Sequence, residues 1–368
     1  MRSVTRNASR CLAVIATLLA AMPALAADLA ALQPLNAPIG DSSVSGLSSG
    51  AFMAVQFGTA WSSIIKGVGV VAGGPFECAQ NSVVGTGPCM HGPPPPLHFF
   101  TDTATEKAAS GEIDATANLA RQQIYVFNGT KDTTVKRAVT DETAAFYRHF
   151  LGEAGAKTQL LYEHELGAGH AFVVPETAAT AGLNDCATSD PPFINRCGDY
   201  DQAGVILRHI YGALNAPSKP DALAGSVKSF EQKKYTAPKS PADLSLGNEG
   251  FVFVPKDCAD AAAPPCRVHI VLHGCLQNSA AIGRTLVDRG GFNAWADTNR
   301  IIVLYPQTIK LTTSTTLNPN ACWDWWGYLM QDRGYFTKSG AQIKALKAML
   351  DDVTAGSRPA APGGASDH

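Results

Sequence analysis

The feature that most constrains the fold is an alternation along the chain of short β-branched, apolar segments with longer helical patterns. Strands are expected at 43–47, 66–71, 122–127, 159–164, 228–235, 250–254, 268–272 and 301–305. Helices are expected at 50–62, 135–151, 202–214, 280–298 and 340–353. Because strand–helix alternation is typical of a mostly parallel sheet covered by helices on both faces, the sequence predicts an α/β fold.

The first 26 residues have the layout of a secretory signal peptide. Three arginines precede an apolar run at 11–21 that contains no acidic residue, and Ala24-Leu25-Ala26 follows. Basic, apolar and small residues in this order are typical of a segment removed by cleavage. An anchor helix is the alternative, but the apolar run is short for a membrane span. We expect cleavage after Ala26 and a secreted protein, extracellular or periplasmic.

The charge balance argues against two classes of partner. The chain has 29 Lys and Arg against 31 Asp and Glu, a net charge of −2, with no basic block. We therefore expect no nucleic acid and no membrane as partner, and a monomer. With 45% hydrophobic and 16% charged residues, the composition suits a packed globular core. The Gly/Pro/Ala-rich tail at 356–368 is expected to be disordered.

Eight of the nine cysteines follow the predicted signal peptide. They are Cys78, Cys89, Cys186, Cys197, Cys258, Cys266, Cys275 and Cys322. Eight cysteines allow 105 pairings, and their order along the chain favours neighbours: 78–89, 186–197, 258–266 and 275–322. An oxidising compartment makes disulfides the default. Zinc would need a C-x-x-C pair or a Cys/His cluster, which the sequence lacks, so we expect no metal.

One motif, Gly-Leu-Ser-Ser-Gly at 46–50, combines a strand before it with a helix after it. Strand, tight turn and helix are what a G-x-S-x-G nucleophile elbow requires, because the turn exposes the central serine at a helix N-terminus. That serine is Ser48, and Ser45 and Ser49 are its local competitors. The alternative is a Gly/Ser-rich turn without chemistry.

A serine hydroxyl needs a base, and the base needs an orienting acid. Asp132 follows the strand expected at 122–127, on a turn that contains Gly129. His170 follows the strand expected at 159–164, on a glycine-flanked loop. The order Ser, Asp, His is that of α/β-hydrolases, so Ser48, Asp132 and His170 are the predicted catalytic triad. The competitors are interpreted as surface or structural residues: Asp141, Glu142, His149 and His164.

The second half of the chain contains a candidate oxyanion loop. The strand expected at 268–272 leads into His273-Gly274-Cys275. A strand followed by His-Gly is typical of the oxyanion loop of α/β-hydrolases, where backbone N–H groups bind the oxyanion. We assign the two donors to the N–H groups of Ser49 and Cys275. His273 is expected to brace the loop and is included among the candidate substrate-binding residues.

Three tryptophans within four residues, Trp323, Trp325 and Trp326, form the other unusual string. Packing around the predicted 275–322 disulfide is one interpretation. The other is that at least one indole lines a substrate cleft, where it offers apolar area and one N–H donor. All three are therefore candidate substrate-binding residues.

The order of these motifs is unusual, because the oxyanion strand of an ordinary α/β-hydrolase precedes the nucleophile and here it follows the whole triad. We predict a single α/β-hydrolase domain over 27–355 with circularly permuted connectivity. Its triad-bearing half is 27–215 and its oxyanion-loop half is 216–355. Chain termini that lie close together at the surface make such permutation tolerable. Two independent domains are the alternative.

These motifs together resemble a known family. The strings Ser-Gly-Leu-Ser-Ser-Gly-Ala-Phe-Met, Leu-His-Gly-Cys-Leu-Gln and Cys-Trp-Asp-Trp-Trp are similar to those of extracellular polyhydroxyalkanoate depolymerases, in particular the single-domain, circularly permuted poly(3-hydroxybutyrate) depolymerases. The resemblance covers about 40–353. It implies Ser48 as nucleophile, Asp132 and His170 as its partners, Cys275 in the oxyanion hole and an aromatic-lined crevice for one polyester strand.

The resemblance implies a secreted serine esterase that acts on poly(3-hydroxybutyrate) or related short-chain polyhydroxyalkanoates without a cofactor. Two other functions stay open at this point. Esterases for feruloyl or acetyl-xylan esters share the triad and the His-Gly loop. A non-catalytic surface-binding protein on a hydrolase scaffold is the other alternative, against which the intact Ser, Asp and His argue.

Overall fold

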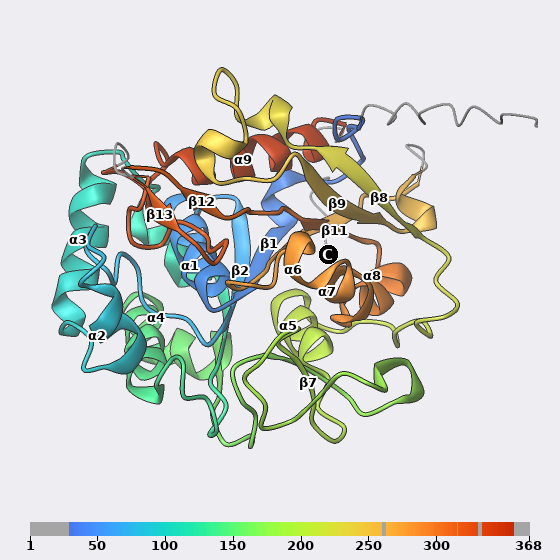
Figure 1. Cartoon of the computed structure of the whole chain (residues 1–368), viewed down its shortest axis with the longest axis horizontal. Helices are drawn as coiled ribbons and strands as arrows, with labels where there is room; N and C mark the ends of the chain where they lie inside the picture. Colours follow the sequence, from blue (N-terminus) through green and yellow to red (C-terminus); the bar gives the residue numbers. More distant parts are fainter. Residues whose placement is uncertain (1–28, 260–262, 315, 330–332, 357–368) are drawn as a thin grey trace, which may run out of the picture.

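An eight-stranded sheet occupies the centre of the computed structural model (Figure 1). The structure describes residues 29–259, 263–314, 316–329 and 333–356. The predicted signal peptide and residues 357–368 of the predicted tail lie outside the described residues.

The sheet has the strand order β4-β3-β2-β1-β10-β11-β9-β8. Its strands are β1 (Ser42–Leu47), β2 (Ile65–Val71), β3 (Gln123–Phe127), β4 (Leu160–Glu163), β8 (Ser226–Glu231), β9 (Glu249–Val254), β10 (Arg267–Leu272) and β11 (Ile301–Tyr305). Neighbours run parallel except at β9, which is antiparallel to β8 and β11. The mostly parallel α/β fold predicted from the sequence is thus confirmed. Both halves of the chain contribute, and they meet where β1 pairs with β10.

Helices cover both faces of this sheet (Figure 1). They are α1 (Ser49–Ala60), α2 (Thr86–His91), α3 (Leu97–Ala109), α4 (Arg137–Gln159, with a non-helical residue at Gly152), α5 (Gln202–Tyr211), α6 (Ser279–Ile282), α7 (Thr285–Arg289), α8 (Phe292–Asn299) and α9 (Ala341–Thr354). Gly58 of α1 packs closely on Val68 of β2, whereas Ile206 of α5 packs on Gly69 of the same strand. Since successive strand residues point to opposite faces, α1 and α5 lie on opposite sides.

Two small sheets lie outside the central sheet, at 172–196 and 311–318. One consists of β5 (Phe172–Val174), β6 (Asn184–Asp185) and β7 (Ile194–Arg196), and the other of β12 (Leu311–Thr312) and β13 (Leu317–Asn318). All four predicted disulfides are present: Cys78–Cys89, Cys186–Cys197, Cys258–Cys266 and Cys275–Cys322. The last one joins the loop after β10 to the tryptophan string, 47 residues further along the chain.

The prediction of one continuous helix at 280–298 is wrong. Three short helices, α6 to α8, replace it, because Gly283 and Gly291 adopt φ values of +61° and +88°, which end a helix. Helices α2 and α3 lie between 62 and 135, where no helix was expected, and α3 begins directly after a run of four prolines at 93–96. Within the described ranges, none of the helices is long and apolar enough to cross a bilayer.

Candidate active site

Ser48 occupies the turn between β1 and α1 in a strained conformation. Its φ of +54° and ψ of −122° are rare for a residue with a Cβ. The turn is held because the Ser48 N–H donates to the Val71 carbonyl at 2.9 Å, and the Ser48 carbonyl accepts from the Phe52 N–H at 3.0 Å. Strain that the surrounding structure maintains in this way is typical of functional sites.

The two glycines of the motif are required by close backbone contacts. A Cβ on Gly46 would collide with the Gly50 carbonyl, one turn ahead. A Cβ on Gly50 would collide with the carbonyl groups of Leu272 and His273 at the end of β10. The serine turn therefore packs directly against the strand that leads to the candidate oxyanion loop.

Asp132 and His170 form a buried, oriented pair. His170 Nδ1 lies 2.8 Å from Asp132 Oδ2, and the two side chains are 6% and 1% exposed. The other carboxylate oxygen, Oδ1, accepts from the N–H groups of Thr134 and Val135 at 2.8 and 3.0 Å. Three hydrogen bonds thus fix the carboxylate, and the carboxylate fixes the orientation of the imidazole.

The two loops that carry this pair are tied together. A Cβ on Gly129 would collide with the Ala168 carbonyl, and that carbonyl accepts from the Lys131 N–H at 3.0 Å. The His170 N–H donates to Ser189 Oγ at 2.9 Å. Because Ser48, Asp132 and His170 follow the parallel strands β1, β3 and β4, all three lie at the same edge of the sheet.

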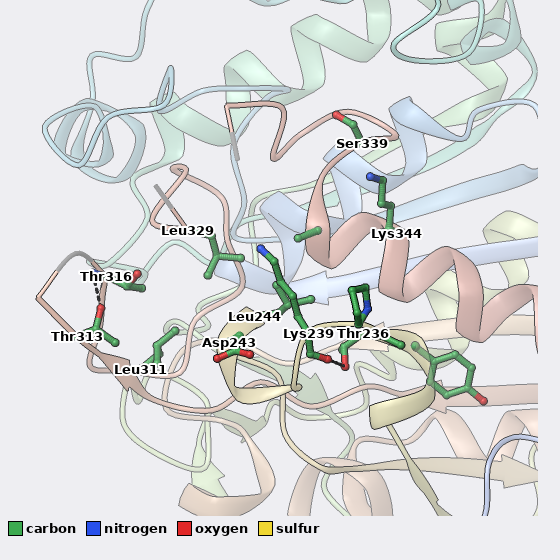
Figure 2. A pocket seen from close by; sticks show the side chains of 14 residues that line it. Thr236, Lys239, Asp243, Leu244, Leu311, Thr313, Thr316, Leu329, Ser339 and Lys344 are labelled. Carbon is green, nitrogen blue, oxygen red and sulfur yellow. Dashed lines mark hydrogen bonds between the residues drawn. The ribbon is translucent and has the colours of Figure 1, made fainter. Parts of the chain in front are cut away.

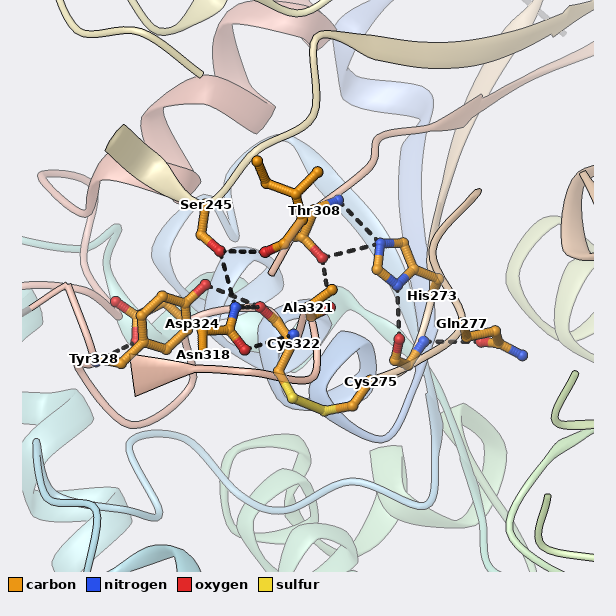
Figure 3. Close-up of a disulfide and its surroundings, with 12 residues drawn as sticks. Ser245, His273, Cys275, Gln277, Thr308, Asn318, Ala321, Cys322, Asp324 and Tyr328 are labelled. Carbon is orange, nitrogen blue, oxygen red and sulfur yellow. Dashed lines mark hydrogen bonds between the residues drawn. A yellow bond between two sulfur atoms is a disulfide. The ribbon is translucent and has the colours of Figure 1, made fainter. Parts of the chain in front are cut away.

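The loop after β10 is held on two sides (Figure 3). Gln277 Oε1 accepts from the Gly274 N–H at 2.8 Å, and Gln277 Nε2 donates to the Phe193 carbonyl at 3.0 Å. The Phe193 ring in turn lies edge-on to the His170 ring at 6.3 Å. Sequence reasoning did not single out Gln277, although it closes the Leu-His-Gly-Cys-Leu-Gln string. Its amide connects the loop of Cys275 with the surroundings of His170.

His273 holds the same loop through hydrogen bonds of both its ring nitrogens. Its Nε2 accepts from the Thr308 N–H at 3.1 Å, so Nδ1 carries the hydrogen and donates to the Gly274 carbonyl at 2.7 Å. The ring is 1% exposed, and burial lowers its pKa from 6.5 to about 4. These bonds agree with a bracing role. Contact between His273 and a substrate stays a prediction.

The three tryptophans lie in different environments. Trp323 has no exposed surface and packs against the His273 ring at 5.6 Å. Trp325 is 4% exposed and stacks on Phe52 of α1 at 4.1 Å. Trp326 is half-buried and packs against Trp325 at 5.4 Å. A substrate contact is therefore most accessible to Trp326.

A second serine–histidine arrangement lies inside the sheet. His269 of β10 has its Nδ1 2.6 Å from Ser43 Oγ and its Nε2 2.8 Å from Ser45 Oγ. Serine bonded to histidine is typical of serine hydrolases, but all three of these side chains are 0% exposed. The sequence analysis missed His269. The available signal was a strand with hydroxyls at alternate positions, which need a buried polar partner.

A groove of about 620 Å³ lies elsewhere, between α9 and the segment 235–244 (Figure 2). Lys239 and Lys344 line it together with apolar side chains that include Leu244 and Leu329. Its lining contains none of the predicted catalytic residues. Over the described ranges, no group of three or more His, Cys, Asp or Glu side chains is arranged to hold a metal ion.

Comparison with known proteins decides the family. No protein-family model matches the chain. The chain is 37% identical over 348 residues to a polyhydroxybutyrate depolymerase of Talaromyces funiculosus, a match that covers 92% of this chain and 96% of that protein. The chain belongs to the polyhydroxybutyrate depolymerase family. This confirms the resemblance drawn from the three sequence strings, and the members of the family are carboxylic ester hydrolases.

Other depolymerases support the assignment. The chain is 39% identical over 322 residues to the poly(3-hydroxybutyrate) depolymerase of Delftia acidovorans, and the match spans only 60% of that longer relative. A crystal structure of the PHB depolymerase from Penicillium funiculosum superposes with a TM-score of 0.80 at 36% identity, over 89% of this chain and 100% of that one. A serine-to-alanine variant of a PHB depolymerase, complexed with an R3HB trimer, matches with the same score and coverage at 35% identity.

Proposed function

We propose that the chain is a secreted serine esterase that hydrolyses the ester bonds of poly(3-hydroxybutyrate) or related short-chain polyhydroxyalkanoates. The observation that carries this proposal is the His170–Asp132 hydrogen bond of 2.8 Å at the sheet edge where the strained Ser48 also lies. The substrate class is supported by the related depolymerase that was captured with an R3HB trimer, an oligoester.

Acylation follows from the roles of the three side chains. With Nδ1–H donated to Asp132, His170 uses Nε2 to accept the Ser48 proton while Oγ attacks the ester carbonyl carbon. Asp132 stabilises the imidazolium that forms. The N–H groups of Ser49 and Cys275 bind the oxyanion. The ester C–O bond then breaks, and His170 returns the proton to the leaving alkoxide.

Deacylation repeats the same steps with water. His170 accepts a proton from water as its oxygen attacks the acyl-enzyme carbonyl, and collapse of the intermediate breaks the bond to Ser48 Oγ. The proton returns to Ser48, and a hydroxyacid or short oligomer leaves. No metal or organic cofactor takes part. Among the candidate substrate contacts, Trp326 offers the accessible ring, with Trp325 and Trp323 packed behind it and His273 under the loop.

The scaffold we propose is one circularly permuted α/β-hydrolase domain over 27–355. If the second half is placed before the first, the strands run β8, β9, β10, β11, β1, β2, β3, β4, with the oxyanion strand ahead of the nucleophile as in ordinary α/β-hydrolases. Secretion, with 1–26 as signal peptide, is supported by the four disulfides.

The decisive experiment compares Ser48→Ala with Ser49→Ala. Ser48→Ala removes the nucleophile and should abolish release of 3-hydroxybutyrate products and of p-nitrophenol from p-nitrophenyl butyrate. Ser49→Ala keeps the backbone N–H and should retain most activity, because the Ser49 hydroxyl has no hydrogen-bond partner within the described part of the chain. Retained turnover in Ser48→Ala would exclude the assignment. Faster release of ferulate from feruloyl esters than of products from the polyester would replace the substrate class.

A further inference from the structure

The middle strand of the sheet is unusually polar for its position. Ser43 and Ser45 of β1 are fully buried, although strands buried on both faces are normally aliphatic. Buried hydroxyls without partners are costly. One imidazole on the neighbouring strand supplies both partners, since His269 lies 2.6 Å from Ser43 Oγ and 2.8 Å from Ser45 Oγ.

Only one direction of hydrogen bonding satisfies the donors in this cluster. Tyr211 of α5 donates its hydroxyl hydrogen to a backbone carbonyl, with that of Val268 at 3.1 Å and that of Asp41 at 3.2 Å, and its oxygen lies 2.6 Å from Ser43 Oγ. Ser43 therefore donates to Tyr211 and accepts from His269 Nδ1–H, which leaves Nε2 to accept from Ser45. The chain of donors ends at a backbone carbonyl. The reverse direction would leave the Ser45 hydrogen without an acceptor among these groups.

The cluster is uncharged and sealed from solvent. Burial lowers the pKa of His269 from 6.5 to about 3, so the imidazole is neutral near pH 7. The Phe292 ring stacks on it at 5.3 Å, and both imidazole nitrogens are occupied by serine hydroxyls. Since no substrate can reach Ser43 or Ser45, the cluster is not a second catalytic centre.

The cluster instead favours one pairing register of β1 against β10 over the alternatives. Ser43 lies opposite His269, and Ser45 lies opposite Val271. A shift of β1 by one residue turns both serines to the other face, and a shift by two keeps at most one bond. Both strands end at the site, because β1 leads into Ser48 and β10 leads into the loop of Cys275.

A register error would be transmitted directly to the site. Gly50 touches the Leu272 carbonyl so closely that a Cβ would collide with it. A slip of one residue displaces the strand by about 3.3 Å, whereas oxyanion donors must be placed to within about 0.5 Å. The backbone ladder alone does not select a register, since every residue offers the same N–H and C=O groups.

We propose that His269 is a positioning residue that fixes β1 against β10 through Ser43 and Ser45, and thereby aligns Ser48 with the N–H group of Cys275. This inference rests on the proposed function. His269 cannot touch the substrate, so it should affect the chemical step and not the binding of a soluble ester.

The test replaces the whole cluster by apolar groups. Removing all the partners together leaves no orphaned group, so the triple variant Ser43→Ala/Ser45→Ala/His269→Leu should keep a Tm near that of the wild type. Tyr211 keeps its bond to the Val268 carbonyl. On p-nitrophenyl butyrate, with active enzyme counted by fluorophosphonate titration, kcat should fall about 10- to 100-fold and KM should stay within about twofold. An unchanged kcat would reduce His269 to a structural role.

Two single variants keep the test decisive if the triple variant does not fold. Gln at 269 places an amide where Nε2 lies and can retain the bond to Ser45, whereas Asn can retain only the bond to Ser43. His269→Gln should therefore keep a severalfold higher kcat than His269→Asn, because Ser45 is nearer to Ser48. Equal kcat values would overturn the inference. A failure of the proposed function is distinguishable, because it would appear as turnover by Ser48→Ala.

Discussion

Two histidines with close hydrogen-bond partners occupy different regions of this molecule. His170 lies on the loop after β4, where its Nδ1 faces the Asp132 carboxylate at 2.8 Å. His269 lies within β10, where both ring nitrogens face serine hydroxyls and no part of the residue is exposed. Both are buried to within a few per cent, yet only the first has an acid to stabilise a positive charge.

The comparison shows that a serine next to a histidine does not by itself define a hydrolase site. A catalytic imidazole must gain and lose a proton, so it needs a partner for its charged form and a path for the substrate. His170 satisfies the first requirement through the carboxylate of Asp132, which three hydrogen bonds hold in place. The interior cluster satisfies neither, and its hydrogen bonds serve a fixed arrangement of two strands.

Of the variants that compare the two regions, the largest effect is expected in the region of His170. Asp132→Asn should lower kcat on p-nitrophenyl butyrate by about 10⁴-fold, because an amide donates where the carboxylate accepts and holds the wrong tautomer of His170. The fold should persist, since Oδ1 of the amide can still accept from Thr134 and Val135. Activity and the circular dichroism melting curve measure the two parts. A loss of less than tenfold would remove Asp132 from the triad.

The second region should reveal itself in the pH dependence of stability. The lowered pKa of His269, about 3 against 6.5, means that the unfolded chain binds a proton between these values and the folded protein does not. The free energy of unfolding therefore decreases as the pH falls from 6.5 towards 3. At pH 4.5 the contribution of His269 to this decrease is about 2–3 kcal/mol.

The matched measurement is urea unfolding at pH 7 and pH 4.5 for the wild type and for Ser43→Ala/Ser45→Ala/His269→Leu. The variant should lose less stability on acidification by that amount. His273, whose pKa burial lowers to about 4, is present in both proteins, so the difference isolates His269. Identical losses in the two proteins would show that His269 titrates normally in the folded state.

The two regions also differ in how far the sequence reveals them. Ser48, Asp132 and His170 could be selected because each follows an expected strand on a turn that contains glycine, and the ends of parallel strands share one edge. The four disulfides followed from the order of the cysteines in the chain. Assignment of catalytic roles to these residues still depends on the variants proposed above.

His269 could not be selected in the same way. Alternation along a strand gives the face on which a side chain lies but not the neighbouring strand, and β1 and β10 are more than 200 residues apart in a sheet order that is not sequential. The broken helix at 280–298 has a similar cause. Its apolar pattern continues through Gly283 and Gly291, and only the backbone conformation of these glycines ends each segment.

The smallest effects are expected when the aromatic neighbour of each histidine is replaced by leucine. Phe193 lies edge-on to His170 at 6.3 Å, and Phe292 stacks on His269 at 5.3 Å. Leucine at either position keeps most of the apolar volume but removes the ring contact, worth about 0.5–1.5 kcal/mol. Phe292→Leu should lower the free energy of unfolding by about 1 kcal/mol and leave kcat unchanged, because His269 keeps its hydrogen bonds to Ser43 and Ser45 when the ring beside it is removed. Phe193→Leu should instead lower kcat about two- to fivefold, because the lost ring packs on His170 at the point where the Phe193 carbonyl binds Gln277, on the loop that carries Cys275. If the two variants have the same ratio of activity loss to stability loss, the distinction between the surroundings of His170 and those of His269 fails at these positions.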